Sequence, residues 1–211
     1  GTQGLHEKHS PLAMAKDLGE HLEATGRSRV ILPRATDVFI RLSDRVAFAR
    51  RNGADLFVSL HADSISRPAV HGASIYTLSE KASDAETEKL AARENRSDAI
   101  AGLNLDTQDE DVANILVDLA MRDTMNQSKF FANEVVTIFH SNGIDTLEVS
   151  HRFAGFAVLK APDIPSVLIE LGYMSNNREA NMLSTPTYRD RIAAALVRGI
   201  DGYFKTVRHG K

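Results

Sequence analysis

The chain has 211 residues, of which 43% are hydrophobic and 25% charged, and its formal net charge is -3. This composition is that of one globular domain able to bury a core, so it excludes a disordered or fibrous protein. The slightly acidic balance argues against the basic face that nucleic-acid binding requires, and the absence of cysteine excludes disulfides and thiolate metal sites.

Membrane insertion is not expected, because no apolar segment approaches the roughly 20 residues that a membrane helix needs. The first residues, GTQGLHEKH, have neither the basic start nor the apolar core of a signal peptide, so any export signal would lie upstream. Nothing in the sequence indicates an obligate second copy, and we expect a monomer. Any metal must be held by histidine, carboxylate or carbonyl oxygen.

The first 32 residues predict a helix and a short strand. Ser10 and Pro11 are typical of an N-cap and a first-turn proline, and apolar residues then recur at helical spacing as far as Gly26. A glycine tolerates the left-handed conformation that often ends a helix, so we expect the helix to stop there. Residues 29–32 follow as a short β-strand.

A second helix and two further strands are predicted next. Residues 42–51 place apolar side chains at helical spacing, and Gly53 is in position to end that helix. The run DLFVSL, residues 55–60, is continuously apolar, as expected of a strand buried on both faces. Residues 72–78, GASIYTL, alternate in the manner of another strand.

Residues 79–111 change the character of the chain, because they are rich in charge and alanine and poor in β-branched residues. We interpret this segment as an insertion within the domain, with a helical core at residues 84–101 that Gly102 ends. A long helix is predicted over residues 112–139, and the acidic residues 109–111 complement the dipole at its N-terminus.

The C-terminal part predicts two strands, residues 156–159 and 166–169, and a last helix with Ile192, Leu196 and Ile200 on one face. No internal repeat is visible. Strands that alternate with helices predict a single α/β domain, with a mostly parallel or mixed sheet covered by helices on both faces. Ligands gather at the carboxyl ends of such strands.

Two polar residues stand at predicted strand ends. His61 directly follows the apolar run DLFVSL, and Glu170 closes the run SVLIE. A buried carboxylate is costly unless it binds something, so Glu170 is a candidate functional residue. The alternatives are a histidine satisfied by a backbone carbonyl and a glutamate paired with one of the arginines.

Four separated blocks occur in the order found in a known family. They resemble the zinc-dependent N-acetylmuramoyl-L-alanine amidases of bacterial cell walls, and the similarity runs over nearly the whole chain. The insertion and residues 115–128 further resemble the septal cell-separation subgroup. The blocks are GLHEKH (4–9), RATD (34–37), LSDRVAFARRNGADLFVSLHAD (42–63) and APDIPSVLIELGYMSN (161–176).

The resemblance implies a Zn²⁺ cofactor and assigns roles to three residues. Glu7 and His61 correspond to zinc ligands, and Glu170 corresponds to the catalytic glutamate. Zinc with three protein ligands keeps a position open for water, lowers the pKa of that water and polarises a carbonyl. Glu170 would then take a proton from the water and hand it to the leaving amine.

One part of the family pattern is missing from residues 1–211. The family's first histidine ligand lies in a D-P-G-H-G-G segment at the end of its first strand, upstream of GLHEKH. We therefore expect residues 1–211 to form a single amidase catalytic domain without this N-terminal strand and its ligand. Residues 79–111 are expected to form a regulatory helical segment inserted within the domain.

The septal subgroup carries a helix that covers the zinc and supplies a blocking glutamate. Of the glutamates in the insertion, Glu94 shares a helix face with Leu90, Ala91 and Ala101, the small apolar side expected to pack down. We therefore predict Glu94 as an inhibitory metal ligand. The alternative is a solvated glutamate that pairs with an arginine.

The predicted function follows from this resemblance. It implies a zinc hydrolase that cleaves the amide between N-acetylmuramic acid and the L-alanine of the stem peptide. The enzyme would be periplasmic, self-inhibited, and activated by a LytM-type protein during cell separation. Two alternatives remain open, an inactive module that binds peptidoglycan or a partner protein and a zinc carboxypeptidase acting on wall peptides.

Overall fold

The protein is described by a computed structural model that covers residues 3–100 and 115–209, with side chains at residues 11–98 and 121–207. Helices and strands are interspersed within these ranges. They are α1 (Gln3–Ala24), α2 (Leu42–Arg51), β1 (Phe57–His61), β2 (Ala73–Leu78), α3 (Ala85–Asn95), α4 (Ser97–Ile100), α5 (Ile115–Ser141), β3 (Thr146–Ala154), the 3₁₀ turn η1 (Ala157–Leu159), β4 (Ser166–Glu170), α6 (Asn177–Ser184) and α7 (Pro186–His209).

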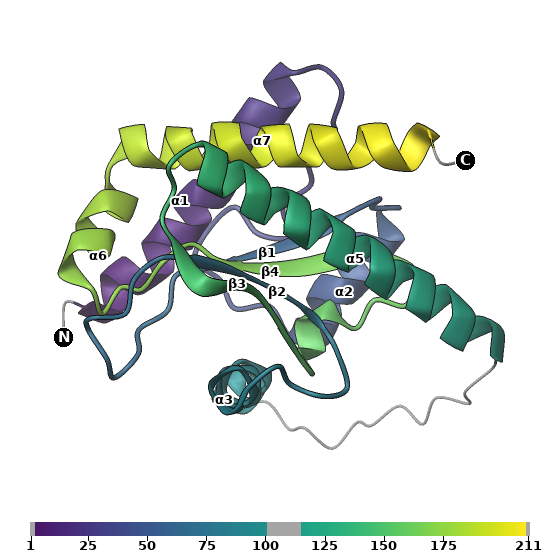
Figure 1. Cartoon of the computed structure of the whole chain (residues 1–211), viewed down its shortest axis with the longest axis horizontal. Helices are drawn as coiled ribbons and strands as arrows, with labels where there is room; N and C mark the ends of the chain where they lie inside the picture. The colour runs from purple at the N-terminus through teal and green to yellow at the C-terminus, as the bar shows by residue number, and fades with distance from the viewer. Residues whose placement is uncertain (1–2, 101–114, 210–211) are drawn as a thin grey trace.

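One mixed sheet organises the described residues, with the strand order β1-β4-β2-β3. Strands β1 and β4 are parallel, as are β2 and β3, and the two pairs meet through the antiparallel contact of β2 with β4. Helices α1, α5 and α7 cover one face of the sheet, while α2 and α3 lie on the other (Figure 1). The α/β prediction with helices on both faces is confirmed.

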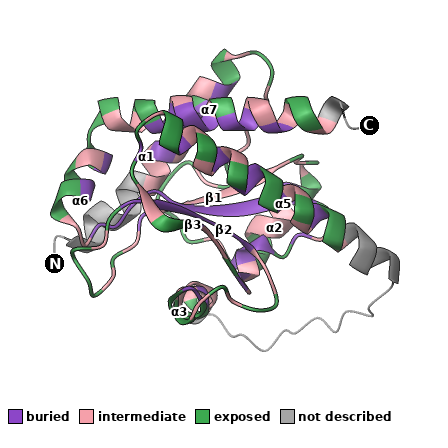
Figure 2. Ribbon diagram, viewed as in Figure 1, coloured by how far each residue is buried: buried purple, intermediate pink, exposed green. Residues whose placement is uncertain are grey.

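The core has a larger part, a smaller part and a third cluster of three buried residues, Ala49, Ala161 and Ile164. The larger part joins α1, α5 and α7 to the sheet and includes Met14, Phe131 and Ile169, while the smaller part lies beneath α3 and includes Tyr76 and Phe156. Strand β4 is buried along its whole length. Figure 2 shows the buried residues concentrated in the sheet and on the helix faces turned towards it.

Most of the predicted helices are present. Helix α2 has the predicted limits, and α5 and α7 lie in the predicted regions. The helix predicted in the insertion is divided, since α3 ends at Asn95 and α4 begins at Ser97. Gly102, residues 109–111 and the predicted start at residue 112 lie outside the described residues.

Two predictions in other segments are wrong, and one strand was not predicted. Helix α1 begins at Gln3, so Ser10 and Pro11 lie inside the helix and do not form its start. Residues 156–159 contain the turn η1 instead of a strand. The strand of this region is β3, whose mixed burial pattern at a sheet edge gives no clear alternation in the sequence.

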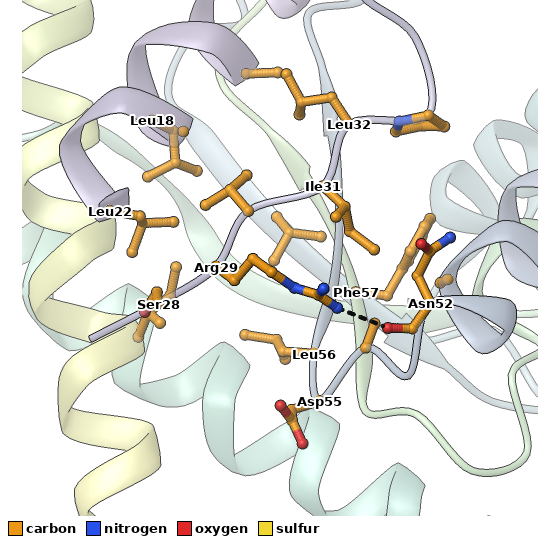
Figure 3. A pocket seen from close by; sticks show the side chains of 18 of the residues that line it. Leu18, Leu22, Ser28, Arg29, Ile31, Leu32, Asn52, Asp55, Leu56 and Phe57 are labelled. Carbon is orange, nitrogen blue, oxygen red and sulfur yellow. Dashed lines mark hydrogen bonds between the residues drawn. The ribbon is translucent and has the colours of Figure 1, made fainter. Parts of the chain in front are cut away.

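Residues 29–32 do not form a strand, and β1 is half-buried rather than buried on both faces. Both differences have one cause. A cavity of about 540 Å³ separates residues 29–32 from β1, so neither segment finds a hydrogen-bonding neighbour on that side (Figure 3). Apolar side chains such as Leu18, Leu22 and Leu56 line this cavity.

No helix within residues 3–100 and 115–209 is both long enough and apolar enough to cross a bilayer.

Candidate metal centre and catalytic carboxylate

His61 and Glu170 lie side by side at the carboxyl ends of two parallel strands. They are the last residues of β1 and β4, and the register of the two strands makes them Cα partners. Both strands are short, mainly apolar runs, FVSLH in β1 and SVLIE in β4, with the β-branched and aromatic residues that favour a strand. Residues 109 positions apart in the chain are thereby brought to one point of the sheet edge.

The surroundings of His61 favour the neutral form of its imidazole. Its Nδ1 lies 3.3 Å from Oε2 of Glu94, and its Nε2 lies 3.0 Å from Oγ of Ser59. Burial lowers the pKa of His61 to about 4. A neutral imidazole is the form that binds metal. The alternative prediction was a histidine bonded to a backbone carbonyl, whereas the partners of His61 are the side chains of Glu94 and Ser59.

Helix α3 carries Glu94 to His61. Asp84 caps the helix by accepting the N–H groups of Glu86 and Thr87, as expected of an N-cap aspartate. Thr87 and Ala91 are buried and face the smaller core. Glu94, one turn beyond Leu90, is therefore turned towards the end of β1, as the prediction for this face required.

Glu94 is largely shielded from solvent, and it also lies near an arginine. Its side chain is 17% exposed, and Arg93 lies 3.7 Å away, on the other carboxylate oxygen from the one that faces His61. Burial, followed by the charge of Asp63, raises the pKa of Glu94 to about 7. A carboxylate held in this way gains from a nearby cation, which favours the ligand interpretation over the solvated alternative.

Asp63 is a further candidate ligand that the sequence analysis did not single out. Ligand atoms of His61, Asp63 and Glu94 all lie within 4.8 Å of one another. The signal was present in the pattern HAD, because residues two apart in an extended chain point to the same side. Arg93 forms an ion pair with Asp63 and thus also holds α3 to this loop.

Glu170 is fully buried next to this cluster. Its Oε1 accepts the backbone N–H of Asp63 at 2.6 Å, whereas its Oε2 is buried without a partner among the described residues. Burial raises the pKa of Glu170 well above its usual value, and the charge of Asp63 adds to this effect. No arginine of the described segments forms a salt bridge with it, so the structural alternative is not supported.

The loops that follow β1 and β4 are fastened to each other. The N–H of Leu171 donates to the carbonyl of His61 at 2.9 Å, and the N–H of Met174 donates to the carbonyl of Asp63 at 2.8 Å. These bonds extend the strand pairing beyond the sheet. The positions of His61, Asp63 and Glu170 are therefore fixed by the backbone as well as by their side chains.

The residues described here fit a divalent metal such as zinc. One neutral histidine and two carboxylates supply nitrogen and oxygen donors of the types that zinc binds. The structure brings His61 and Glu94, two of the predicted ligands, to within 3.3 Å of each other. The side chain of Glu7, the other predicted ligand, lies outside the described residues, although its backbone belongs to α1.

Comparison with known proteins gives a consistent result. The model of the N-acetylmuramoyl-L-alanine amidase family matches residues 1–202. The amidase AmiA of Salmonella typhimurium is 39% identical over 208 residues, which are 97% of this chain and 70% of that protein. AmiA of Escherichia coli is 37% identical over 211 residues, with 97% and 70% covered.

A solved structure shares the fold. The crystal structure of an N-acetylmuramoyl-L-alanine amidase from Clostridium difficile 630 superposes with a TM-score of 0.66, covering 94% of this chain and 84% of that one. The two sequences are 21% identical, so this likeness concerns the fold alone.

Proposed function

This chain belongs to the N-acetylmuramoyl-L-alanine amidase family, whose members hydrolyse an amide of peptidoglycan, and we propose that it does so as a zinc-dependent, self-inhibited enzyme. The bond cleaved joins N-acetylmuramic acid to the L-alanine of the stem peptide. The observation that carries this proposal is the meeting of His61, Glu94 and Glu170 at the ends of β1 and β4.

In the described part of the chain, His61 and Asp63 would hold the zinc, and Glu94 would join them in the inhibited state. Their donor atoms lie close enough together to share one ion. Bound zinc would activate a water molecule and polarise the amide carbonyl of the substrate. Glu7 is proposed as a further ligand on the basis of the GLHEKH block.

Glu170 is proposed as the general base and general acid. Because Oε1 is held by the N–H of Asp63, the unpartnered Oε2 is the atom available to receive a proton. It takes the proton from the attacking water and delivers it to the nitrogen of the departing L-alanine, which completes the cleavage. Its burial raises its affinity for a proton, which suits a group that must hold one between two steps.

Helix α3 is proposed as the inhibitory element. The Glu94 carboxylate, bound to the metal, would take the position that water and the substrate carbonyl need. Besides Glu94, several polar attachments hold the helix. Near its C-terminal end, Asn95 bonds the carbonyl of Gly155 and the N–H of Ala157, each at 2.8 Å, and Arg93 pairs with Asp63. At its N-terminal end, Asp84 pairs with Arg152. The same attachments can be exchanged for water or for a partner protein.

A LytM-type activator is the partner we propose for opening the site. Glu86, Glu88 and Lys89 are exposed on α3, so a second protein can reach the helix without first unfolding the core. The enzyme would act in the periplasm during cell separation, where continuous cleavage of the wall would be harmful. The proposal requires no second copy of the chain.

The cavity beside β1 is proposed to accept a further strand of the catalytic domain. In the parallel ladder, the amides of Phe57 and His61 face β4, so those of Val58 and Leu60 face the cavity. An extended apolar segment placed there would pair with this edge and with residues 29–32. This supports the expectation of an N-terminal strand that brings another histidine ligand.

Hydrogen exchange tests the proposed strand. The amides of Val58 and Leu60 should exchange rapidly in a protein of residues 1–211 and become protected in a version extended upstream. Equal exchange in both versions would contradict the proposal.

Product analysis of digested peptidoglycan tests the proposed reaction. The amidase releases stem peptides with a free N-terminal L-alanine, and this release should stop after chelation and return with Zn²⁺. Release of terminal D-alanine would instead indicate the carboxypeptidase alternative. Binding to the wall without any released product would indicate the inactive module.

A further inference from the structure

Glu179 is a buried carboxylate that the proposed reaction does not use. It lies in the first turn of α6 and is 8% exposed. Its Oε1 accepts the backbone N–H of Gly72 at 2.8 Å, and its Oε2 accepts the backbone N–H of Tyr173 at 2.7 Å. No salt bridge within the described segments includes this residue, so its two oxygens serve the backbone alone.

The residue type fits this task. Both partners of Glu179 are N–H donors, and a carboxylate is the side chain that offers two acceptor oxygens at once. Glutamine has the same shape but would turn an NH₂ group towards one of the two donors. Burial raises the pKa of Glu179, and the two backbone hydrogen bonds oppose that rise by stabilising the ionised form.

Gly172 allows the carboxylate to come this close. Its φ is +148°, a conformation that side chains rarely adopt. A Cβ atom added at this position would lie 2.8 Å from Oε1 of Glu179. The glycine and the glutamate therefore form one unit, in which the turn after β4 wraps around the carboxylate.

This unit joins the two backbone segments that flank Glu170. Tyr173 follows Glu170 by three residues, and Gly72 immediately precedes β2, in which Ser74 is the Cα partner of Glu170. Helix α6 is itself fixed, because Asn176 caps it and also donates to the carbonyl of Pro68. The end of β4 is thus held from its β2 side, whereas the bonds to His61 hold it from its β1 side.

We propose that Glu179 is a positioning residue for the hydrolysis, holding Glu170 in its catalytic place by fastening the turn after β4 to the start of β2. The inference rests on the proposed function of Glu170 as general base. Glu179 itself contacts neither the substrate nor the metal site. Its loss should slow the chemical step and leave substrate binding and zinc content unchanged.

The test compares E179Q with the wild-type protein, and with E148Q as a control. Glu148 is exposed on β3, so this variant makes the same chemical change away from the turn. A displacement of about 1 Å at a reacting group can reduce the rate by about 10²-fold, so we expect kcat of E179Q to fall by about 10- to 100-fold. KM and bound zinc should stay unchanged, and the amides of Gly72 and Tyr173 should lose protection from hydrogen exchange.

The possible outcomes separate this inference from the proposed function. An active wild-type protein with an E179Q variant of normal kcat would overturn the positioning role alone. An E170Q variant as active as the wild-type protein would overturn the role of Glu170, and the positioning role with it. If E179Q does not fold, E179D retains the charge but is too short for both donors, and a normal kcat in that variant would equally contradict the proposal.

Discussion

Strand β4 and helix α3 each bring a buried glutamate to the same site, and they are held in different ways. Every residue of β4 is buried, with paired neighbours on both sides. Helix α3 buries Thr87 and Ala91, packs Leu90 partly against the smaller core, and is otherwise attached through polar groups near its two ends. Burial of apolar surface is costly to undo, whereas polar attachments are readily replaced by water.

The difference suits the separate tasks proposed for the two elements. A group that must act in every cycle is best placed on an element that cannot move, as proposed for Glu170. A group that must be withdrawn belongs on an element that can detach without disturbing the core, as proposed for Glu94. Each of the following experiments changes one side of this comparison.

Replacement of Glu170 by glutamine should have the largest effect. The amide cannot accept the proton of the attacking water, so kcat should fall by about 10²- to 10⁴-fold. The hydrogen bond from the N–H of Asp63 can be kept by the amide oxygen, so the melting temperature and the zinc content should change little. Retained activity in a variant with normal zinc content would mean that another group is the base.

Replacement of Glu94 by alanine should act in the opposite direction. Removal of the blocking carboxylate should raise the activity without activator by about 5- to 150-fold, the range of typical coupling energies between two states. The measurement is the rate of release of stem peptide from purified peptidoglycan. The control is E88A, which removes an exposed carboxylate from the same helix, and equal rates in the two variants would remove Glu94 from the switch.

The pH dependence of stability in the metal-free protein sharpens the comparison. Burial raises the pKa of Glu94 from its ordinary 4.5 to about 7, so its contribution to stability is complete below pH 4.5 and is lost as the pH rises through about 7. His61 has the opposite sign, because its pKa is lowered from 6.5 to about 4 and its contribution is lost as the pH falls through that range.

E94Q should therefore be more stable than the wild-type protein at pH 8 but not at pH 5. The stability difference between the two proteins should change by about 2 kcal/mol between these values, since one pKa unit corresponds to about 1.4 kcal/mol. Urea unfolding in the presence of a chelator measures it. A difference that is the same at both pH values would show that Glu94 is not held in an environment that disfavours its charge.

Replacement of Asn95 by alanine should have the smallest effect. The variant loses the two hydrogen bonds to Gly155 and Ala157 but keeps Glu94. Helix α3 is therefore held less firmly, but it still carries the proposed blocking carboxylate. Two net hydrogen bonds of about 1 kcal/mol each set an upper limit of roughly 30-fold, and we expect a few-fold rise in activity without activator. The amides of α3 should also exchange hydrogen faster in this variant. Exchange at the wild-type rate would mean that Asn95 does not hold the helix in place.

Sequence patterns predict best those elements that neighbouring residues in the chain are sufficient to define. Helix α2 has its predicted limits because its apolar spacing and Gly53 suffice to define it. Residues 29–32 have a strand-like composition, but a strand also needs a neighbour, and a cavity lies where that neighbour would be. The mixed sheet order could not be predicted, because pairing between distant segments leaves no periodic signal.

Much of the site could be anticipated, since His61 and Glu170 stand at the ends of apolar runs and the resemblance supplied their roles. Asp63 and Glu179 were missed for different reasons. Asp63 could have been found, because it is two residues from His61 and side chains at this spacing in an extended chain point to the same side. Glu179 acts through the backbone of Gly72 and Tyr173, and a hydrogen bond to a distant N–H has no sequence signature.

The path of α3 over the sheet means that a small rotation of the helix produces a large displacement of Glu94. At one end Asp84 is tied to Arg152 on β3, and at the other Glu94 reaches His61 on β1, so the helix crosses the sheet from edge to edge. Eleven residues at about 1.5 Å each form an arm of about 16 Å. A rotation of about 10° around the β3 end would move Glu94 by about 3 Å, far beyond the ~0.2 Å tolerance of a metal–ligand bond. A partner protein that replaces the polar attachments at the Glu94 end would thus open the proposed site by a small displacement, while the β3 end and the core stay in place.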